Sequence, residues 1–287
     1  MKLHAPTLTV QGGDARLTAR LAADAPDGFA VDLFVELPAL LLPVTDRSAN
    51  PFAALSSLLA TSIGEDLEIE APVSPLLVEG INRSAAVYGA WVGRRGASVR
   101  ATREVVATHP GTEHALMFSR GVDSSHTLVE SERSGDPPDR LVTIDGIDLG
   151  PPELGRAANQ ATADMARRLG YRHVLLRTGN RAAFDQVADW RLLHGAAFSG
   201  ILLALGPLFA RVDISAALAN RPDERDGAQA GLVAGFSTEH TQVSVKGSTS
   251  TRPQKIRTVA ADERLLPVLK VCWQPGAVGN CGRCVKC

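Results

Sequence analysis

Short apolar runs alternate with longer segments of helical spacing from His109 onward, and this alternation constrains the fold more than any other feature of the chain. Strands and helices are predicted there in turn: strands at 114–119, 141–147, 173–178 and 208–215, and helices at 123–133, 153–170 and 183–206. Strands separated by helices of this length are joined by right-handed crossovers, which build a parallel sheet with helices on both faces. The sequence therefore predicts an α/β domain over residues 109–287.

Residues 1–108 have a different texture, with short alternating or apolar runs separated by prolines and turn residues. Such runs are typical of strands. Helices are predicted at 51–63, where Asn50 is a good N-cap and Pro51 suits the first helical position, and at 75–88. The sequence predicts a smaller α+β domain ahead of the α/β domain. It contains no apparent reaction centre, so its expected role is to shape the substrate pocket or to form an interface.

Composition excludes several classes of protein. Hydrophobic residues make up 45% and charged residues 21% of the 287 residues, which excludes a disordered chain. The net charge of −1 gives no basic surface for a nucleic acid. The most apolar stretch, 195–210, is too short and too interrupted to span a bilayer, and the N-terminal residues lack a signal-peptide pattern. We expect a cytoplasmic protein without a nucleic-acid or membrane partner, and a homodimer stays open.

A loop rich in Ser and Gly follows the first predicted strand of the α/β domain and opens its first helix. It comprises Ser119, Arg120, Gly121, Val122, Asp123, Ser124 and Ser125. A helix N-terminus binds anions because its first N–H groups are unpaired and its dipole is positive there. Gly lets the backbone approach a ligand closely, and a carboxylate in the turn can hold a divalent metal. The loop is predicted to bind nucleotide phosphates, and the alternative is a strand-to-helix turn without a ligand.

These residues resemble the Ser-Gly-Gly-x-Asp-Ser loop of the ATP pyrophosphatase (PP-loop) superfamily, with Arg120 in place of the second Gly. An Arg can still pair with a phosphate. The resemblance implies the HUP-type α/β fold, ATP and Mg²⁺ as cofactors, and attack of an acceptor oxygen on the α-phosphate. Asp145 ends the second predicted strand, where proteins of this superfamily bind the adenosine of ATP. The resemblance therefore makes Asp145 a candidate for nucleotide binding.

The four cysteines of the chain all lie near its C-terminus, at Cys272, Cys281, Cys284 and Cys287. Four thiolates suit tetrahedral Zn²⁺ and leave no open coordination position, which favours a structural zinc site. An iron–sulfur cluster, a redox disulfide pair and unliganded thiols stay as alternatives. The spacing resembles the C-terminal zinc site of the 7-cyano-7-deazaguanine synthase family. Residues 109–287 also resemble a family of bacterial PP-loop proteins of unknown function.

Three further residues are candidates for catalysis. Arg252 and Lys255 lie three apart at a predicted helix start, and the resemblance implies that they neutralise departing pyrophosphate. The alternative is an ordinary solvated helix end. His194 lies beside Gly195 in an apolar helical stretch, where it either takes part in catalysis or substrate binding or is a hydrogen-bonded core histidine.

The function predicted from these features is an ATP-dependent, AMP-forming ligase. It adenylates a carboxylate, amide or ureido oxygen of a small-molecule acid or amide, and ammonia or an amine then displaces AMP. A sulfur transferase is the alternative within this class, but sulfur transfer usually needs a mobile cysteine, and every cysteine here belongs to the cluster. A nucleotide- and zinc-binding module without catalysis is the alternative of a different class, and Arg120 in the loop favours it.

Overall fold

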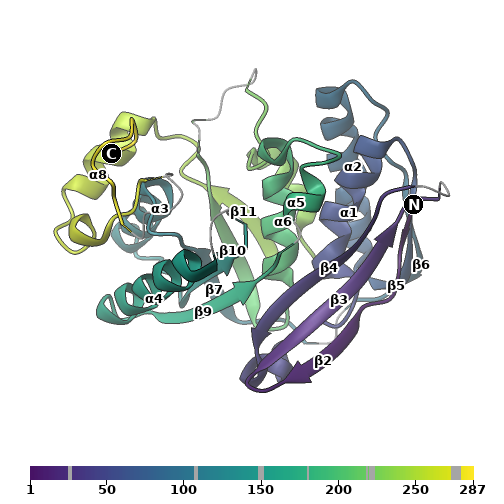
Figure 1. Ribbon diagram of the computed structural model, residues 1–287, viewed down its shortest axis with the longest axis horizontal. Helices are drawn as coiled ribbons and strands as arrows, with labels where there is room; N and C mark the ends of the chain where they lie inside the picture. The colour runs from purple at the N-terminus through teal and green to yellow at the C-terminus, as the bar shows by residue number, and fades with distance from the viewer. Residues whose placement is uncertain are drawn as a thin grey trace.

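The computed structural model describes residues 1–24, 28–106, 109–147, 152–179, 181–217, 219, 224–272 and 279–287. Over these residues the chain is a mixed α/β structure built on one 11-stranded sheet, most of whose neighbouring strands are parallel (Figure 1). The predicted domain boundary at residue 108 lies outside the described residues.

The N-terminal half contains the strands and both helices that its turn-punctuated pattern predicts. The elements are β1 (Lys2–Leu3), β2 (Thr7–Gln11), β3 (Asp14–Ala22), β4 (Ala30–Pro38), η1 (Ala39–Val44), α1 (Asn50–Ile63), β5 (Leu67–Val73), α2 (Pro75–Val92) and β6 (Val99–Glu104). Local sequence sets the helix ends. Gly64 ends α1 in the left-handed conformation, and the Ser74 side chain begins α2 by accepting a hydrogen bond from the Leu77 amide.

The C-terminal half contains the predicted alternation of strands and helices. Its elements are β7 (Glu113–Met117), α3 (Val122–Arg133), β8 (Arg140–Asp145), α4 (Pro152–Arg168), β9 (Arg172–Arg177), α5 (Arg181–Phe184), α6 (Trp190–Leu203), β10 (Phe209–Ser215), α7 (Ala230–Val233), η2 (Ala234–Phe236), β11 (Gln242–Lys246), α8 (Arg252–Ala260) and η3 (Leu266–Val268).

The helical stretch expected over 183–206 is divided into two helices, α5 and α6. The break comes just before Asp189, whose side chain accepts a hydrogen bond from the Arg191 amide (2.9 Å) and thereby caps a new helix. An Asp at this position favours a helix start over continuation of the preceding turn.

The strands of the C-terminal half form a parallel, doubly wound array in the order β11-β10-β7-β8-β9. Consecutive residues of its strands face different cores: Ala115 and Val142 pack in one buried cluster, Leu116 and Leu141 in another. Helices therefore cover both faces, as predicted. The chain runs outward from β7 to β9 and then crosses to β10, so the strand order reverses between β7 and β10.

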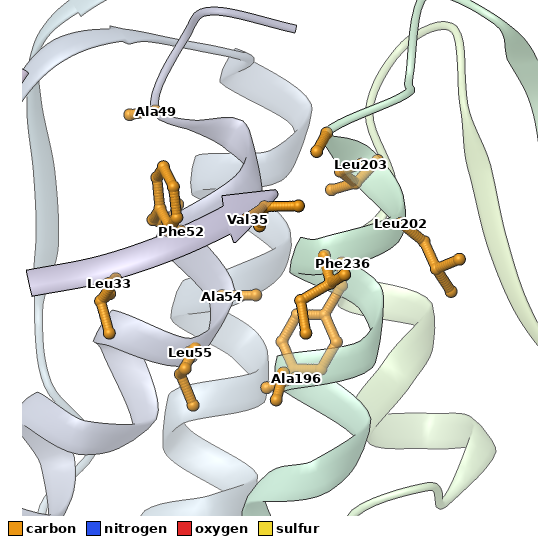
Figure 2. Packing of buried hydrophobic residues seen from close by; sticks show 14 of the residues in the cluster. Leu33, Val35, Ala49, Phe52, Ala54, Leu55, Ala196, Leu202, Leu203 and Phe236 are labelled. Atoms are coloured by element: carbon orange, nitrogen blue, oxygen red, sulfur yellow. The ribbon is translucent and has the colours of Figure 1, made fainter. Parts of the chain in front are cut away.

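The two halves share one sheet and one large core. β4 pairs antiparallel with β9, with Glu36 opposite Arg177, and this pairing joins the β4-β3-β1-β5-β6 strands to the parallel array. Figure 2 shows Phe52 and Leu55 of α1 in the same buried cluster as Ala196 of α6 and Phe236. The two halves differ in sequence pattern, but the sheet and the core are continuous across them.

Candidate functional site

The predicted anion-binding loop lies at the point where the strand order of the parallel array reverses. It follows β7 and opens α3, and the carboxyl end of the neighbouring strand β10 lies beside it. Ser215, the last residue of β10, donates a hydrogen bond to Thr127 of α3 (2.9 Å), and Thr127 donates to the Asp123 carbonyl oxygen (3.1 Å). Open parallel sheets bind ligands at the carboxyl ends of their strands at such a reversal.

Three of the predicted site residues meet here, although more than 120 positions separate Asp123 from Arg252 and Lys255. Arg252 donates to one carboxylate oxygen of Asp123 (2.8 Å), and Lys255 donates to the other (3.2 Å). The Lys255 ammonium group also donates to the Ala216 carbonyl oxygen, and its side chain is only 1% exposed. This burial contradicts the solvated helix end that the sequence left open for Lys255.

Local sequence directs both basic residues toward Asp123. Thr251 and Gln254 form a capping box, which begins α8 at Arg252. Arg252 and Lys255 then lie on one face of the helix, which packs against α3 at the left of Figure 1. Gly247, beyond the end of β11, has a φ of 74°. It lies next to the site, because a Cβ there would lie 3.7 Å from Lys255 Cε.

The first turns of α3 hold buried polar atoms that have no partner among the described residues. They are the hydroxyl oxygen of Ser125, a residue with 0% exposure, and Nδ1 of His126. Burial lowers the pKa of His126, with Glu130 opposing the effect and Lys255 adding to it. Gly121 provides no side-chain cap for α3. An unsatisfied buried hydroxyl costs free energy, and a ligand is one source of a missing partner.

The remaining loop residues form the turn itself. The Ser119 hydroxyl accepts a hydrogen bond from the Gly121 amide (3.3 Å), and the Ser124 hydroxyl donates to the Gly121 carbonyl oxygen (3.2 Å). The side chain of Val122 is buried in the core beside Phe118. The loop is thus held by its own serines and by one apolar anchor.

The Arg120 side chain turns away from Asp123 and into the protein. Its backbone has a φ of 62°, and the residue is 6% exposed. The guanidinium donates to Thr162 (3.0 Å) and to the carbonyl oxygens of Ala158 (3.3 Å) and Val268 (3.5 Å). No carboxylate of the described residues forms an ion pair with it, and burial lowers its pKa. The predicted contact between this side chain and a phosphate stays a prediction.

Asp145 and His194 occupy other places. Asp145 ends β8, next to β7, and its carboxylate accepts a hydrogen bond from the Gly146 amide (2.9 Å), so it lies at the same sheet edge as the loop. His194 lies in α6 with its Nε2 3.5 Å from Asp226, and its ring contacts Trp190 and Phe198. Figure 1 shows α6 on the other side of the sheet strands from α8. The structure does not bring His194 to Asp123.

The four cysteines form a compact cluster, as their spacing predicts. Their sulfur atoms all lie within 4.8 Å of one another and could hold a metal ion. The nearest pairs are Cys284–Cys287 (3.4 Å), Cys281–Cys287 (3.8 Å) and Cys272–Cys284 (3.9 Å). A tetrahedral zinc ion with Zn–S bonds of about 2.3 Å has S–S edges of about 3.8 Å, and the Cys281–Cys287 and Cys272–Cys284 distances are close to that value.

Backbone amides favour the thiolate form of two of the four cysteines, Cys281 and Cys284. The amides of Arg283 and Cys284 donate to Cys281 Sγ (3.4 and 3.3 Å), and these hydrogen bonds lower the pKa of Cys281 to about 6. The pKa of Cys284 is lowered by the Cys287 amide, whereas burial and neighbouring thiols raise that of Cys287 to about 11. Cys272 is 8% exposed and packs against the protein, and Cys287 is exposed.

Sequence reasoning missed the parts of the site that come from distant strands. Thr127, Ser215 and Ala216 complete the ion-pair network, but no local motif marks them. Their only signal was position, because Ser215 ends the strand next to the loop and Ala216 follows it. Asn280 makes three hydrogen bonds to residues 269–272, and no sequence motif indicates this role.

Comparison of the chain with protein-family models, with curated proteins and with solved structures finds no match. The PP-loop resemblance therefore depends on the loop and the cysteine spacing alone. Among the described residues, no helix combines the length and the apolar character that crossing a membrane requires.

Proposed function

We propose that this chain binds the phosphates of ATP at the N-terminus of α3 and activates a carboxylate, amide or ureido oxygen as its adenylate. The observation that carries the proposal is the meeting of Asp123, Arg252 and Lys255 at the reversal point of a parallel sheet. Two cations against one carboxylate leave a net positive charge, and the dipole of α3 adds to it. The neighbouring Ser125 hydroxyl lacks a partner there, as a group that awaits an anion would.

The proposed chemistry assigns a task to each residue. The free amides at the start of α3 and the Ser125 hydroxyl bind phosphate oxygens. Lys255 and Arg252 stabilise the charge that grows on pyrophosphate as the acceptor oxygen attacks the α-phosphate and the bond to the bridging oxygen breaks. Asp123 orients the two cations before ATP binds. With ATP present, Asp123 would also hold Mg²⁺, which screens the phosphate charge.

The acceptor is then released from AMP by a nitrogen nucleophile. Ammonia or an amine attacks the adenylated carbon and loses a proton as AMP leaves, which gives an amide from a carboxylate and an amidine from an amide. A nitrile forms when an adenylated primary amide instead eliminates AMP and a proton. All four cysteines lie in one cluster, which supports nitrogen over sulfur as the attacking atom. Sulfur transfer stays the alternative within this class.

The cysteine cluster is proposed to hold one structural zinc ion. Four sulfurs at the corners of one small tetrahedron suit a single ion. In a four-iron cluster each cysteine binds a different iron, so the sulfurs must lie further apart. Cys272, Cys281, Cys284 and Cys287 fill all four positions, so the ion would support the fold and take no part in the reaction.

A binding module without catalysis is the second candidate, and one observation favours it. The Arg120 side chain, which replaces the second Gly of the loop pattern, donates to α4 and to Val268 instead of facing the site. Such a loop could bind an anion through its backbone while lacking a side chain for the transition state. The proposed contact of His194 with substrate has no support from its position.

An ATP–pyrophosphate exchange assay tests the proposal directly. Purified protein is incubated with ATP, Mg²⁺, labelled pyrophosphate and a panel of carboxylic acids, amides and ureas. Labelled ATP that depends on one acceptor class supports adenylation, and subsequent addition of ammonia, an amine or sulfide identifies the nucleophile. Binding of ATP without exchange for any acceptor would support the binding module. Absence of both would contradict the nucleotide site.

Metal analysis by plasma mass spectrometry tests the zinc proposal, with an expected stoichiometry of one zinc per chain. Cys272→Ser should lose both metal and soluble protein, because this cysteine is buried against the domain. Cys287→Ser should lower metal retention but leave most of the fold, because Cys287 is exposed. Metal-free protein with four reactive thiols would contradict the assignment.

A further inference from the structure

The segment that leads from α8 to the cysteine cluster lies against the turn of the anion-binding loop. The Lys270 amide donates a hydrogen bond to the Arg120 carbonyl oxygen (3.0 Å). In the other direction, the Arg120 guanidinium donates to the Val268 carbonyl oxygen (3.5 Å). A Cβ at Gly121 would lie 3.9 Å from the Lys270 carbonyl oxygen. Residues 268–270 therefore contact the turn both at its backbone, at Arg120 and Gly121, and through the Arg120 side chain.

The same segment is tied to the cysteine cluster by Asn280. Its side-chain oxygen accepts hydrogen bonds from the amides of Val271 (2.8 Å) and Cys272 (3.2 Å). Its side-chain nitrogen donates to the Leu269 carbonyl oxygen (2.7 Å). Asn280 directly precedes Cys281, so one side chain links two cysteines of the cluster to the residues that hold the loop.

Apolar packing connects the same parts. Phe118 and Val122, on either side of the loop turn, belong to a buried cluster that includes Leu265. Val268, Leu269 and Val271 pack against this cluster. The polar contacts between loop and segment therefore lie at the margin of a shared core.

The turn needs outside support because of its backbone conformation. A left-handed φ at a residue other than Gly is unfavourable, and Arg120 adopts one of 62°. Among the described non-glycine residues it alone has a positive φ. The contacts with Lys270, Val268 and α4 offset that cost.

We propose that metal bound at the cysteine cluster sets the conformation of loop 119–125, with Asn280 and Arg120 as positioning residues. Metal fixes Cys272 relative to Cys281, which fixes Asn280 and the segment before Cys272, and this segment holds the turn at Arg120. Metal and a phosphate anion then bind with positive coupling. The anion part of this inference rests on the proposed function, whereas the effect on the loop does not.

Hydrogen–deuterium exchange tests the loop effect without any nucleotide. Exchange of peptides covering 118–126 is compared between zinc-loaded and chelator-treated protein, with the β2–β3 hairpin as an internal reference. We expect exchange of the loop to become about tenfold faster without metal, within the usual range of coupling between sites, and the hairpin to be unchanged. Unchanged loop exchange after complete loss of metal would overturn the inference.

Variants test the route. Asn280→Ala keeps all four thiols, and Arg120→Gly keeps the turn accessible while removing the guanidinium contacts. Either variant, loaded with one zinc, should lose most of the tenfold difference. Val285→Ala is the matched control within the cluster, because Val285 is 98% exposed, and it should keep the wild-type difference. Zinc-loaded Arg120→Gly with the full wild-type difference would overturn the role of Arg120, and the same result for Asn280→Ala that of Asn280.

Binding of magnesium pyrophosphate, measured by calorimetry, separates this inference from the proposed function. Zinc-loaded wild type should bind about tenfold more tightly than zinc-free protein. Equal affinities would contradict coupling while leaving the anion site intact. No binding by zinc-loaded protein would contradict the anion site, and the exchange experiment would still decide whether metal sets the loop.

Discussion

Two networks of charged side chains lie on one face of β10, one toward each end of the strand. At the amino end, Asp213 contacts His114 of β7 (2.8 Å) and accepts from Ser244 of β11 (2.5 Å), and Arg211 donates to Asp136 (2.6 Å). At the carboxyl end, Ser215 leads through Thr127 to the ion pairs of Asp123. Residues two apart on a strand share a face, so both networks face α3.

The networks differ in how their charges balance. At the amino end, two carboxylates face one guanidinium and one imidazole, and strands on both sides contribute partners. At the carboxyl end, two cations face one carboxylate at a helix N-terminus, beside the unpartnered Ser125 hydroxyl. Burial of charge alone therefore does not indicate a functional site. Each network holds a buried donor without a hydrogen-bond partner among the described residues, Arg211 Nε at the amino end and the Ser125 hydroxyl at the carboxyl end, so the excess of positive charge around Asp123 is what distinguishes the two.

The largest effect is expected from the amino-end network, and it concerns stability. Asp213→Asn leaves His114 and Arg211 without their buried carboxylate, and the loss of one partner of such a pair costs about 3 to 5 kcal/mol of unfolding free energy. Urea unfolding measures this loss. Asp136→Asn is the matched control, because Asp136 is exposed and its ion pair should contribute less than about 1 kcal/mol. Pyrophosphate binding should be unchanged in both, and loss of binding would erase the contrast between the networks.

The same carboxylate gives the amino-end network a pH dependence. Burial raises the pKa of Asp213, but hydrogen bonds from His114 and Ser244 and the charge of Arg211 outweigh burial, so its pKa is lowered. Its contribution to stability is therefore fully present above the unfolded pKa of about 3.9 and is lost as the pH falls through the folded value. Wild type should lose this stability below about pH 4, and Asp213→Asn should show a flatter acid limb.

At the carboxyl end the expected effect is on catalysis. Under the proposed function Lys255 meets charge that develops in the transition state. Lys255→Ala should therefore lower kcat for pyrophosphate exchange about a hundredfold, equivalent to about 3 kcal/mol, with a smaller change in KM for ATP. Arg257→Ala on the same helix is the control, because Arg257 is exposed. If the Lys255→Ala variant kept the wild-type kcat, the ion pair of Lys255 with Asp123 would be structural and Lys255 would have no catalytic role.

The smallest change tests the unpartnered hydroxyl. Ser125→Ala removes no hydrogen bond of the described structure, so the unfolding free energy should not fall. If the hydroxyl binds a phosphate oxygen, pyrophosphate affinity should drop about tenfold, which is the effect of one hydrogen bond to a charged group. Ser134→Ala at the other end of α3 should change neither quantity. If Ser125→Ala kept the wild-type affinity for pyrophosphate, the Ser125 hydroxyl would not bind the anion and would not distinguish the two networks.

Features encoded locally were predicted well from the sequence. Strand and helix positions follow from periodicity, the loop from its Ser and Gly residues, and the cysteine cluster from spacing alone. Features that depend on distant contacts were not. The direction of Arg120 depends on α4 and Val268, and Lys255 is held by the Ala216 carbonyl oxygen, just after a strand end that no motif marks. The break before α6 was missed because Asp189 caps a helix within an otherwise continuous helical pattern.

The pairing of β4 with β9 has a consequence for how the chain folds during synthesis. Arg177 lies opposite Glu36 and also forms an ion pair with Asp14, so the partner of β4 is made 141 residues after it. Until then the ribosome-bound N-terminal half lacks the strand that pairs with β4 at Glu36. Open edges template aggregation, and contacts this distant slow folding. We therefore expect nascent chains that stop before residue 172 to bind chaperones and longer ones to be released.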